Sequence, residues 1–125
     1  MMTSIDYLSI AKQYFPEESI WESSSKEGFM IKGSYFFPSQ CHHLLFLYED
    51  NIVSAVHHLS IEPGYSHHVY PSPRGSDHCA VDLNDYIQIY KPSKESFIKM
   101  INMTLYNIKI IKLNLKLMRI NDDFT

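Results

Sequence analysis

Apolar residues recur at helical spacing near the start of the chain. We expect a helix over residues 3–15, because four apolar residues fall near one of its faces: Ile5, Leu8, Ala11 and Phe15. Thr3 with Asp6 three positions later is typical of a capping box, in which each side chain accepts from the backbone N–H of the other. Pro16 ends this helix, and the segment from Pro16 to Ser19 is suited to one further short turn.

The pattern then changes to an alternation of apolar and polar residues with a period of two, which is typical of β-strands. We expect strands over residues 29–37, 42–48 and 52–61. The last two are expected to form a hairpin, because residues 49–51 between them are Glu-Asp-Asn, and Asn and Asp tolerate the left-handed backbone of tight turns.

A long loop is expected between residues 62 and 78, because this stretch contains the prolines Pro63, Pro71 and Pro73 and the glycines Gly64 and Gly75. Loops of this length often carry function. Residues 79–83 and 86–90 follow as two further expected strands.

The last third of the chain has two interpretations. Ser93 is suited to cap a helix whose inward residues would be Phe97, Ile98, Ile101 and Leu105. Beyond it, apolar residues alternate with Lys112, Asn114 and Lys116, and this favours a half-exposed strand carrying Ile111, Leu113, Leu115 and Leu117. A continuous helix over residues 93–120 is the competing interpretation, because Lys and Leu are good helix formers.

These elements predict an α+β fold. We expect a mostly antiparallel sheet of about five strands, with the N-terminal helix and a second helix near the C-terminus packed on one face. A chain of 125 residues is expected to form a single domain over residues 1–125.

Composition and charge refine this picture. The chain is 45% hydrophobic and 20% charged, which is ordinary for a globular protein. Residues 1–90 hold four basic and eleven acidic residues, a charge of −7, and residues 91–125 carry +4. No secretory signal is visible at the N-terminus and no apolar run is long enough for a membrane span, so we expect a cytoplasmic protein with free thiols.

Seven histidines are the most unusual feature of the composition, and six of them form the adjacent pairs His42-His43, His57-His58 and His67-His68. Neighbouring residues on a strand point to opposite faces, so at most one ring of a strand-borne pair is expected to reach a common ligand. His57 shares its parity with Val53 and Ala55, and we expect it on the core side.

Two kinds of chemistry remain open for these histidines. A zinc site would use residues of the types that zinc prefers, Cys41, His43, His68 and His78, although they lack the short ligand spacing of known zinc motifs. A histidine acid–base enzyme of the hydrolase or ribonuclease type would combine His58, His68 and His78 with Arg74 or Lys32. We expect no cofactor, with zinc as the alternative.

Our leading hypothesis is a non-enzymatic binding protein that recognises another macromolecule. The loop supplies residue types common at protein interfaces, namely Tyr65, His67, His68, Tyr70, Arg74 and Asp77. The acidic charge argues against nucleic acid and favours a basic protein partner, as for an immunity or antitoxin-type inhibitor of a basic toxin or nuclease. No phosphate-binding glycine loop and no G-x-S-x-G elbow occurs in the sequence.

Overall fold

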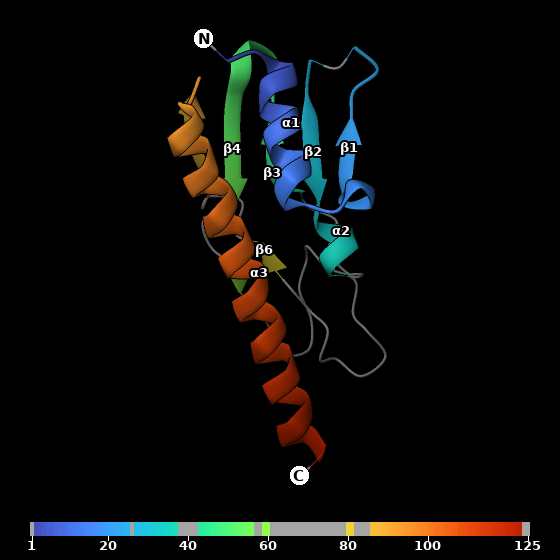
Figure 1. Ribbon diagram of the computed structural model, residues 1–125. Helices are drawn as coiled ribbons and strands as arrows, with labels where there is room; N and C mark the ends of the chain where they lie inside the picture. Colours follow the sequence, from blue (N-terminus) through green and yellow to red (C-terminus); the bar gives the residue numbers. More distant parts are fainter. Residues whose placement is uncertain are drawn as a thin grey trace.

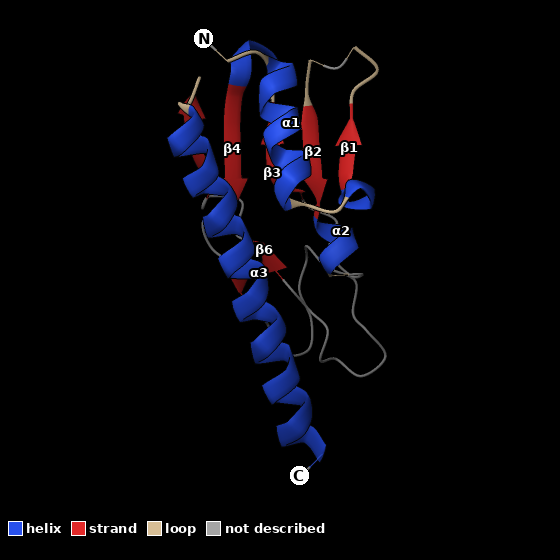
Figure 2. Ribbon diagram, in the orientation of Figure 1, coloured by secondary structure: helices blue, strands red, loops and turns tan. Residues whose placement is uncertain are grey.

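The computed structural model describes residues 2–25, 27–37, 43–56, 59–60, 80–81 and 86–123. Its centre is a five-stranded antiparallel sheet in the order β1-β2-β3-β4-β7. The strands are β1 (Ile20–Glu22), β2 (Phe29–Lys32), β3 (His43–Leu47), β4 (Ile52–Val56) and β7 (Tyr86–Tyr90). Helices α1 (Ser4–Tyr14) and α3 (Lys94–Asp123) lie on the same side of the sheet (Figures 1 and 2), which confirms the predicted α+β fold.

Shorter elements complete the described structure. A 3₁₀ turn covers Glu17–Ser19, a single helical turn α2 covers Gly33–Phe36, and a second 3₁₀ turn covers Glu49–Asn51. Strands β5 (Leu59–Ser60) and β6 (Ala80–Val81) pair with each other in a separate two-stranded sheet.

Local signals in the sequence set three of the element ends as predicted. The N–H of Thr3 donates to the Asp6 carboxylate at 2.7 Å and the N–H of Asp6 donates to Thr3 Oγ1 at 3.3 Å, so the capping box is present. The N–H of Ser96 donates to Ser93 Oγ at 3.1 Å and caps α3. In the β3–β4 turn, Asp50 and Asn51 adopt positive φ values of 64° and 58°.

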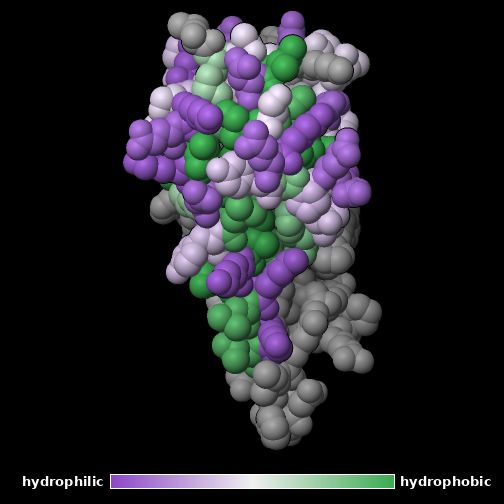
Figure 3. Space-filling view, viewed as in Figure 1, coloured by the Kyte–Doolittle hydropathy of each residue, from purple (hydrophilic) through white to green (hydrophobic). Residues whose placement is uncertain are grey.

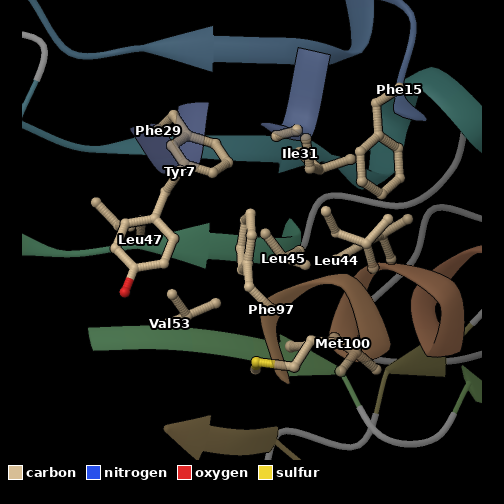
Figure 4. Close-up of a cluster of buried hydrophobic side chains, with 14 of the residues drawn as sticks. Tyr7, Phe15, Phe29, Ile31, Leu44, Leu45, Leu47, Val53, Phe97 and Met100 are labelled. Carbon is tan, nitrogen blue, oxygen red and sulfur yellow. The ribbon is translucent and has the colours of Figure 1, made fainter. Parts of the chain in front are cut away.

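The core lies between the helices and one face of the sheet. The ring of Tyr7 on α1 meets the ring of Phe97 on α3 edge to face, with centroids 5.0 Å apart. Figure 4 shows these two rings over the inward side chains of the strands, which include Phe29, Ile31, Leu45, Leu47 and Val53. The Tyr7 hydroxyl also donates to the backbone carbonyl of Pro92 at 2.5 Å, and burial raises the pKa of this phenol.

The strand predicted over residues 29–37 is wrong in its second half. Pairing with β3 shifts register after Ile31, and the chain then forms the helical turn α2, closed by the N–H of Phe37 on the carbonyl of Gly33. Consecutive residues of a strand would point to opposite faces. The helical turn instead lets Phe36 pack against Phe15 while Phe37 is buried in the core.

The strand favoured over residues 111–117 is also wrong, because α3 continues through this segment. Residues at helical spacing face the core, namely Phe97, Ile101, Thr104, Ile108 and Ile111. A second apolar stripe runs along the opposite side of α3 and is half-exposed or more at Tyr106, Leu113 and Leu117. Two stripes on opposite sides of one helix leave apolar residues at every other position over residues 111–117, which imitates a strand. Figure 3 shows the apolar surface of this part of α3.

Two further expectations need correction. Ile5, predicted to face inward, is 60% exposed, and Tyr7 takes the buried position on α1. Strand β1 was not predicted, because a three-residue strand at a sheet edge gives little alternation to detect. It is tied to α1 by an ion pair of 2.7 Å between Lys12 and Glu22, which raises the pKa of Lys12.

Helix α3 reaches well past the sheet. Its 30 residues correspond to a length of about 45 Å, whereas a five-residue strand spans about 17 Å. The C-terminal half therefore projects beyond the strands (Figure 1). Among the described helices, none has the length and apolar character needed to cross a bilayer.

Truncating the ring that joins the helices to the sheet should destabilise the whole domain. We expect Phe97→Ala to lower the free energy of unfolding by about 3–5 kcal/mol, because it empties a fully buried ring position. Tyr106→Ala on the same helix, at a side chain that is 63% exposed, should change it by no more than about 0.5 kcal/mol. Urea denaturation measures both, and equal losses would contradict the packing described.

Candidate functional site

Strand register divides the sheet into two faces of different character. Ile20, Ile31, Leu45, Ala55 and Ile87 lie in one row across the five strands and face the helices. The neighbouring row contains Trp21, Met30, Phe46, Ser54 and Gln88, and alternation turns it to the opposite side. Both described long helices lie on the first side (Figure 1), so the second side is the candidate surface.

The second side carries aromatic residues from three of the five strands or their ends. We call Trp21, Phe46, Tyr48, Tyr86 and Tyr90 the aromatic face. Trp21 and Tyr48 are each 49% exposed and Tyr90 is 62% exposed, while Phe46 and Tyr86 are half-buried. Solvent-exposed aromatic rings gathered on one face are typical of binding surfaces.

Ring-to-ring contacts hold this face in a fixed arrangement. Phe46 lies at the centre, with its centroid 4.8 Å from that of Tyr48 and 5.5 Å from that of Tyr86, both edge to face. The His43 ring adds a third edge contact at 6.3 Å. Lys91 at the end of β7 places its Nζ 5.1 Å from the centroid of Tyr90. Phe46, Tyr48 and Tyr86 are therefore preorganised, which lowers the entropy cost of binding.

A polar contact links the outer strand to β3. The hydroxyl of Tyr86 donates to the backbone carbonyl of His43 at 3.3 Å, across the intervening strand β4. Burial raises the pKa of Tyr86 and the neighbouring Tyr48 raises it further, so the phenol stays protonated near neutral pH. Burial lowers the pKa of His43, which favours its neutral imidazole.

Ser54 lies in the middle of the same face and is fully buried. Its hydroxyl has no hydrogen-bond partner among the described residues. A buried unpaired hydroxyl costs free energy, because its hydrogen bonds to water are not replaced. The middle of the aromatic face therefore contains one buried hydroxyl whose lost hydrogen bonds to water are not replaced by a described residue.

The candidate residues from the sequence fall mostly outside the described residues. This holds for the proposed binding residues Tyr65, His67, His68, Tyr70, Arg74 and Asp77. It holds equally for the metal candidates Cys41, His68 and His78, for the acid–base candidate His58, and for His57, which was expected in the core. His43 is described, and it lies at the start of β3 beside the aromatic face.

The aromatic face was missed by the sequence reasoning, although part of its signal was available. Phe46 and Tyr48 share one parity in the strand over residues 42–48, opposite to Leu45 and Leu47. Residues 86–90, with the sequence Tyr-Ile-Gln-Ile-Tyr, show the same separation of aromatic and aliphatic positions. Trp21 gave no comparable signal, because its strand was not predicted.

Metal ligands and a pocket are the other features of the described residues that bear on function. Within this part of the chain, no group of three or more His, Cys, Asp or Glu side chains is placed to hold a metal ion. A pocket of about 450 Å³ lies elsewhere, between the start of α1 and the turn into α3, and its lining includes Asp6, Tyr7 and Lys91. Asp6 and Tyr7 already serve structural hydrogen bonds there.

Comparison of the chain with protein-family models, with curated proteins and with solved structures returned no match. The geometry of the aromatic face is therefore the evidence that bears on function.

Acid should destabilise the fold in part through His43. Its pKa is lowered in the folded state, so the unfolded chain binds a proton more readily below the ordinary value of 6.5. The stability contributed by neutral His43 is complete above that pH and is lost as the pH falls toward the folded-state pKa. We expect His43→Phe to lose less free energy of unfolding than the wild type between about pH 7.5 and pH 5. Comparing the two proteins cancels the other six histidines, and parallel pH profiles would contradict the assignment.

Removing the unpaired hydroxyl of Ser54 should stabilise the protein. We expect Ser54→Ala to raise the free energy of unfolding by about 1 kcal/mol, because the alanine methyl needs no hydrogen bond. Ser19→Ala is the matched control, since Ser19 is equally buried but donates to the carbonyl of Pro16 at 2.6 Å. That control should lose about 1 kcal/mol in the same urea titration. Similar losses in both variants would show that Ser54 is also paired.

Proposed function

We propose that this protein is a non-enzymatic binding module that recognises another protein through the aromatic face. The observation that carries the proposal is the exposure of Trp21, Tyr48 and Tyr90 on the side of the sheet away from α1 and α3. Trp and Tyr bury large apolar areas at little cost in side-chain entropy, and they dominate the binding energy of many protein interfaces.

The charges of this face support a protein partner over a nucleic acid. Lys32 is the one charged side chain among the described strand residues that point to this side. Proteins that bind single-stranded nucleic acid by stacking also need a cationic groove along the phosphate backbone. The described face has aromatic rings without such a groove.

The charge of the chain favours a basic partner. Residues 1–90 carry −7, and long-range attraction of this kind speeds the association of oppositely charged proteins. An immunity or antitoxin-type inhibitor of a basic toxin or nuclease is the particular form that we propose. In this form the acidic surface steers the encounter and the aromatic face supplies the contact energy.

Site-specific cross-linking tests the proposal. Benzoylphenylalanine is placed at position 48 on the aromatic face, or at position 106 on the outer side of α3 as the control. Both native residues are exposed tyrosines. In the cells that naturally make the protein, we expect an adduct to a basic protein from position 48 and none from position 106.

The identified partner then allows a quantitative test. Trp21 is the only tryptophan of the chain, so its fluorescence reports directly on the aromatic face. Trp21→Ala and Tyr48→Ala should each weaken the partner's affinity by about 30-fold or more, as expected for hot-spot residues. Tyr106→Ala should stay within about twofold.

Three results would overturn the proposal. They are adducts from position 106 alone, binding of oligo(dT) with protection of Trp21 from acrylamide quenching, and unchanged partner affinity in both face variants. The second result would instead assign the face to single-stranded nucleic acid.

A further inference from the structure

The outer strand β7 forms one edge of the main sheet, since it pairs with β4 on one side only among the described strands. Its sequence from Tyr86 to Tyr90 is Tyr-Ile-Gln-Ile-Tyr, with no charge, no proline and no glycine. Proteins usually protect an edge strand with charged residues, proline or a bulge, because its free backbone groups attract other strands. Strand β7 has none of these features within its five residues.

The direction of the backbone groups in β7 follows from one hydrogen bond. The N–H of Lys91 donates to the carbonyl of Asn51, so these residues form a hydrogen-bonded pair of the β4–β7 ladder. Such pairs alternate along antiparallel strands, which assigns the groups of Ile87 and Ile89 to β4. The N–H and C=O groups of Tyr86, Gln88 and Tyr90 therefore point to the free edge.

We propose that β7 pairs antiparallel with β7 of a second copy of this chain, about a two-fold axis at Gln88. The strand sequence is a palindrome centred on Gln88, so this register sets Gln88 against Gln88 and Tyr86 against Tyr90. All residues of these pairs direct their backbone groups outward, as hydrogen-bonded pairs require. Three pairs exchanging two bonds each give about six backbone hydrogen bonds between the copies.

The side chains of β7 are also compatible with pairing between two copies of this strand. Like charges directly opposite each other would oppose a symmetric strand pair, and β7 has no charged residue to create them. Tyrosine would lie beside tyrosine on one face and isoleucine beside isoleucine on the other. Aromatic and β-branched cross-strand pairs of this kind stabilise sheets.

On the helix side, β7 is only partly covered. Helix α3 packs against β3 and β4, and Ile87 and Ile89 on β7 are half-buried beside them. Gln88 and Tyr90 on the other side are exposed. Two copies joined in this way would share one ten-stranded sheet, and their aromatic faces would lie on the same side. The inference depends on the edge strand and not on the identity of any other partner.

The mass in solution tests the inference. Light scattering coupled to size exclusion should give twice the 14.6 kDa of the chain for the wild type. Gln88→Lys should give the monomer mass, because it places two ammonium groups directly opposite each other at the axis. Gln88→Thr is the control and should remain a dimer, since threonine is neutral and favours strands. Circular dichroism and thermal unfolding verify that each variant is folded.

Disulfide trapping tests the register. In a background in which Cys41 and Cys79 are replaced by serine, Gln88→Cys should oxidise to a covalent dimer. Opposed residues of a hydrogen-bonded pair have Cα atoms about 5.5 Å apart, within the range of a disulfide. Ile87→Cys should not cross-link, because in this register its counterpart is Ile89 and the two copies of residue 87 lie about 8 Å apart, beyond that range.

Two outcomes would overturn the inference. One is a wild-type protein that stays monomeric up to about millimolar concentration, a range in which even weak complexes form. The other is a dimer that survives Gln88→Lys but is lost in Leu113→Lys or Leu117→Lys, which would assign the contact to the exposed stripe of α3. Loss of binding to another protein in the aromatic-face variants, with the dimer intact, separates this inference from the proposed function.

Discussion

The contact between Tyr7 and Phe97 is the interaction on which the rest of the structure depends. It joins the first helix to the last, and the two rings together cover the inward residues of β2, β3 and β4. The Tyr7 hydroxyl on Pro92 fixes the point at which α3 leaves β7, because Pro92 lies between those two elements. This contact thereby brings an N-terminal and a C-terminal segment into one core, and the two helices cover one side of the sheet.

The described helices cover only one side of the sheet, and this determines the character of the other side. The strands alternate, so each aliphatic residue turned to the helices leaves its neighbour turned away from them. In this chain those neighbours are often aromatic, as at Phe46, Tyr86 and Tyr90. Contacts between the rings then give an ordered surface without a covering layer of described helices. The same alternation that builds the core therefore supplies the candidate binding face.

Features set by neighbouring residues were predictable from the sequence, and features set by distant contacts were not. The caps at Thr3 and Ser93 and the turn at Asp50 and Asn51 involve residues within a few positions of each other. The helical turn at Gly33 forms because Phe36 meets Phe15, a contact that no local pattern shows. On α3, the outer stripe through Leu113 imitated a strand until the core contacts of Ile108 and Ile111 were known. The histidine pairs are visible as sequence neighbours, whereas the common face of the aromatic residues depends on strand register.

The position of α3 in the chain has a consequence for biosynthesis. Every strand of the main sheet precedes this helix, so the ribosome makes Leu45, Val53 and their inward neighbours before the α3 residues that complete their cover. Chains that are still growing, or that are released before Phe97, present the part of the apolar side that α3 covers to the surrounding solution. Unshielded apolar surface and free strand edges make such incomplete chains substrates for chaperones and proteases. During translation the chain therefore passes from a partly covered sheet with exposed apolar residues to a closed domain.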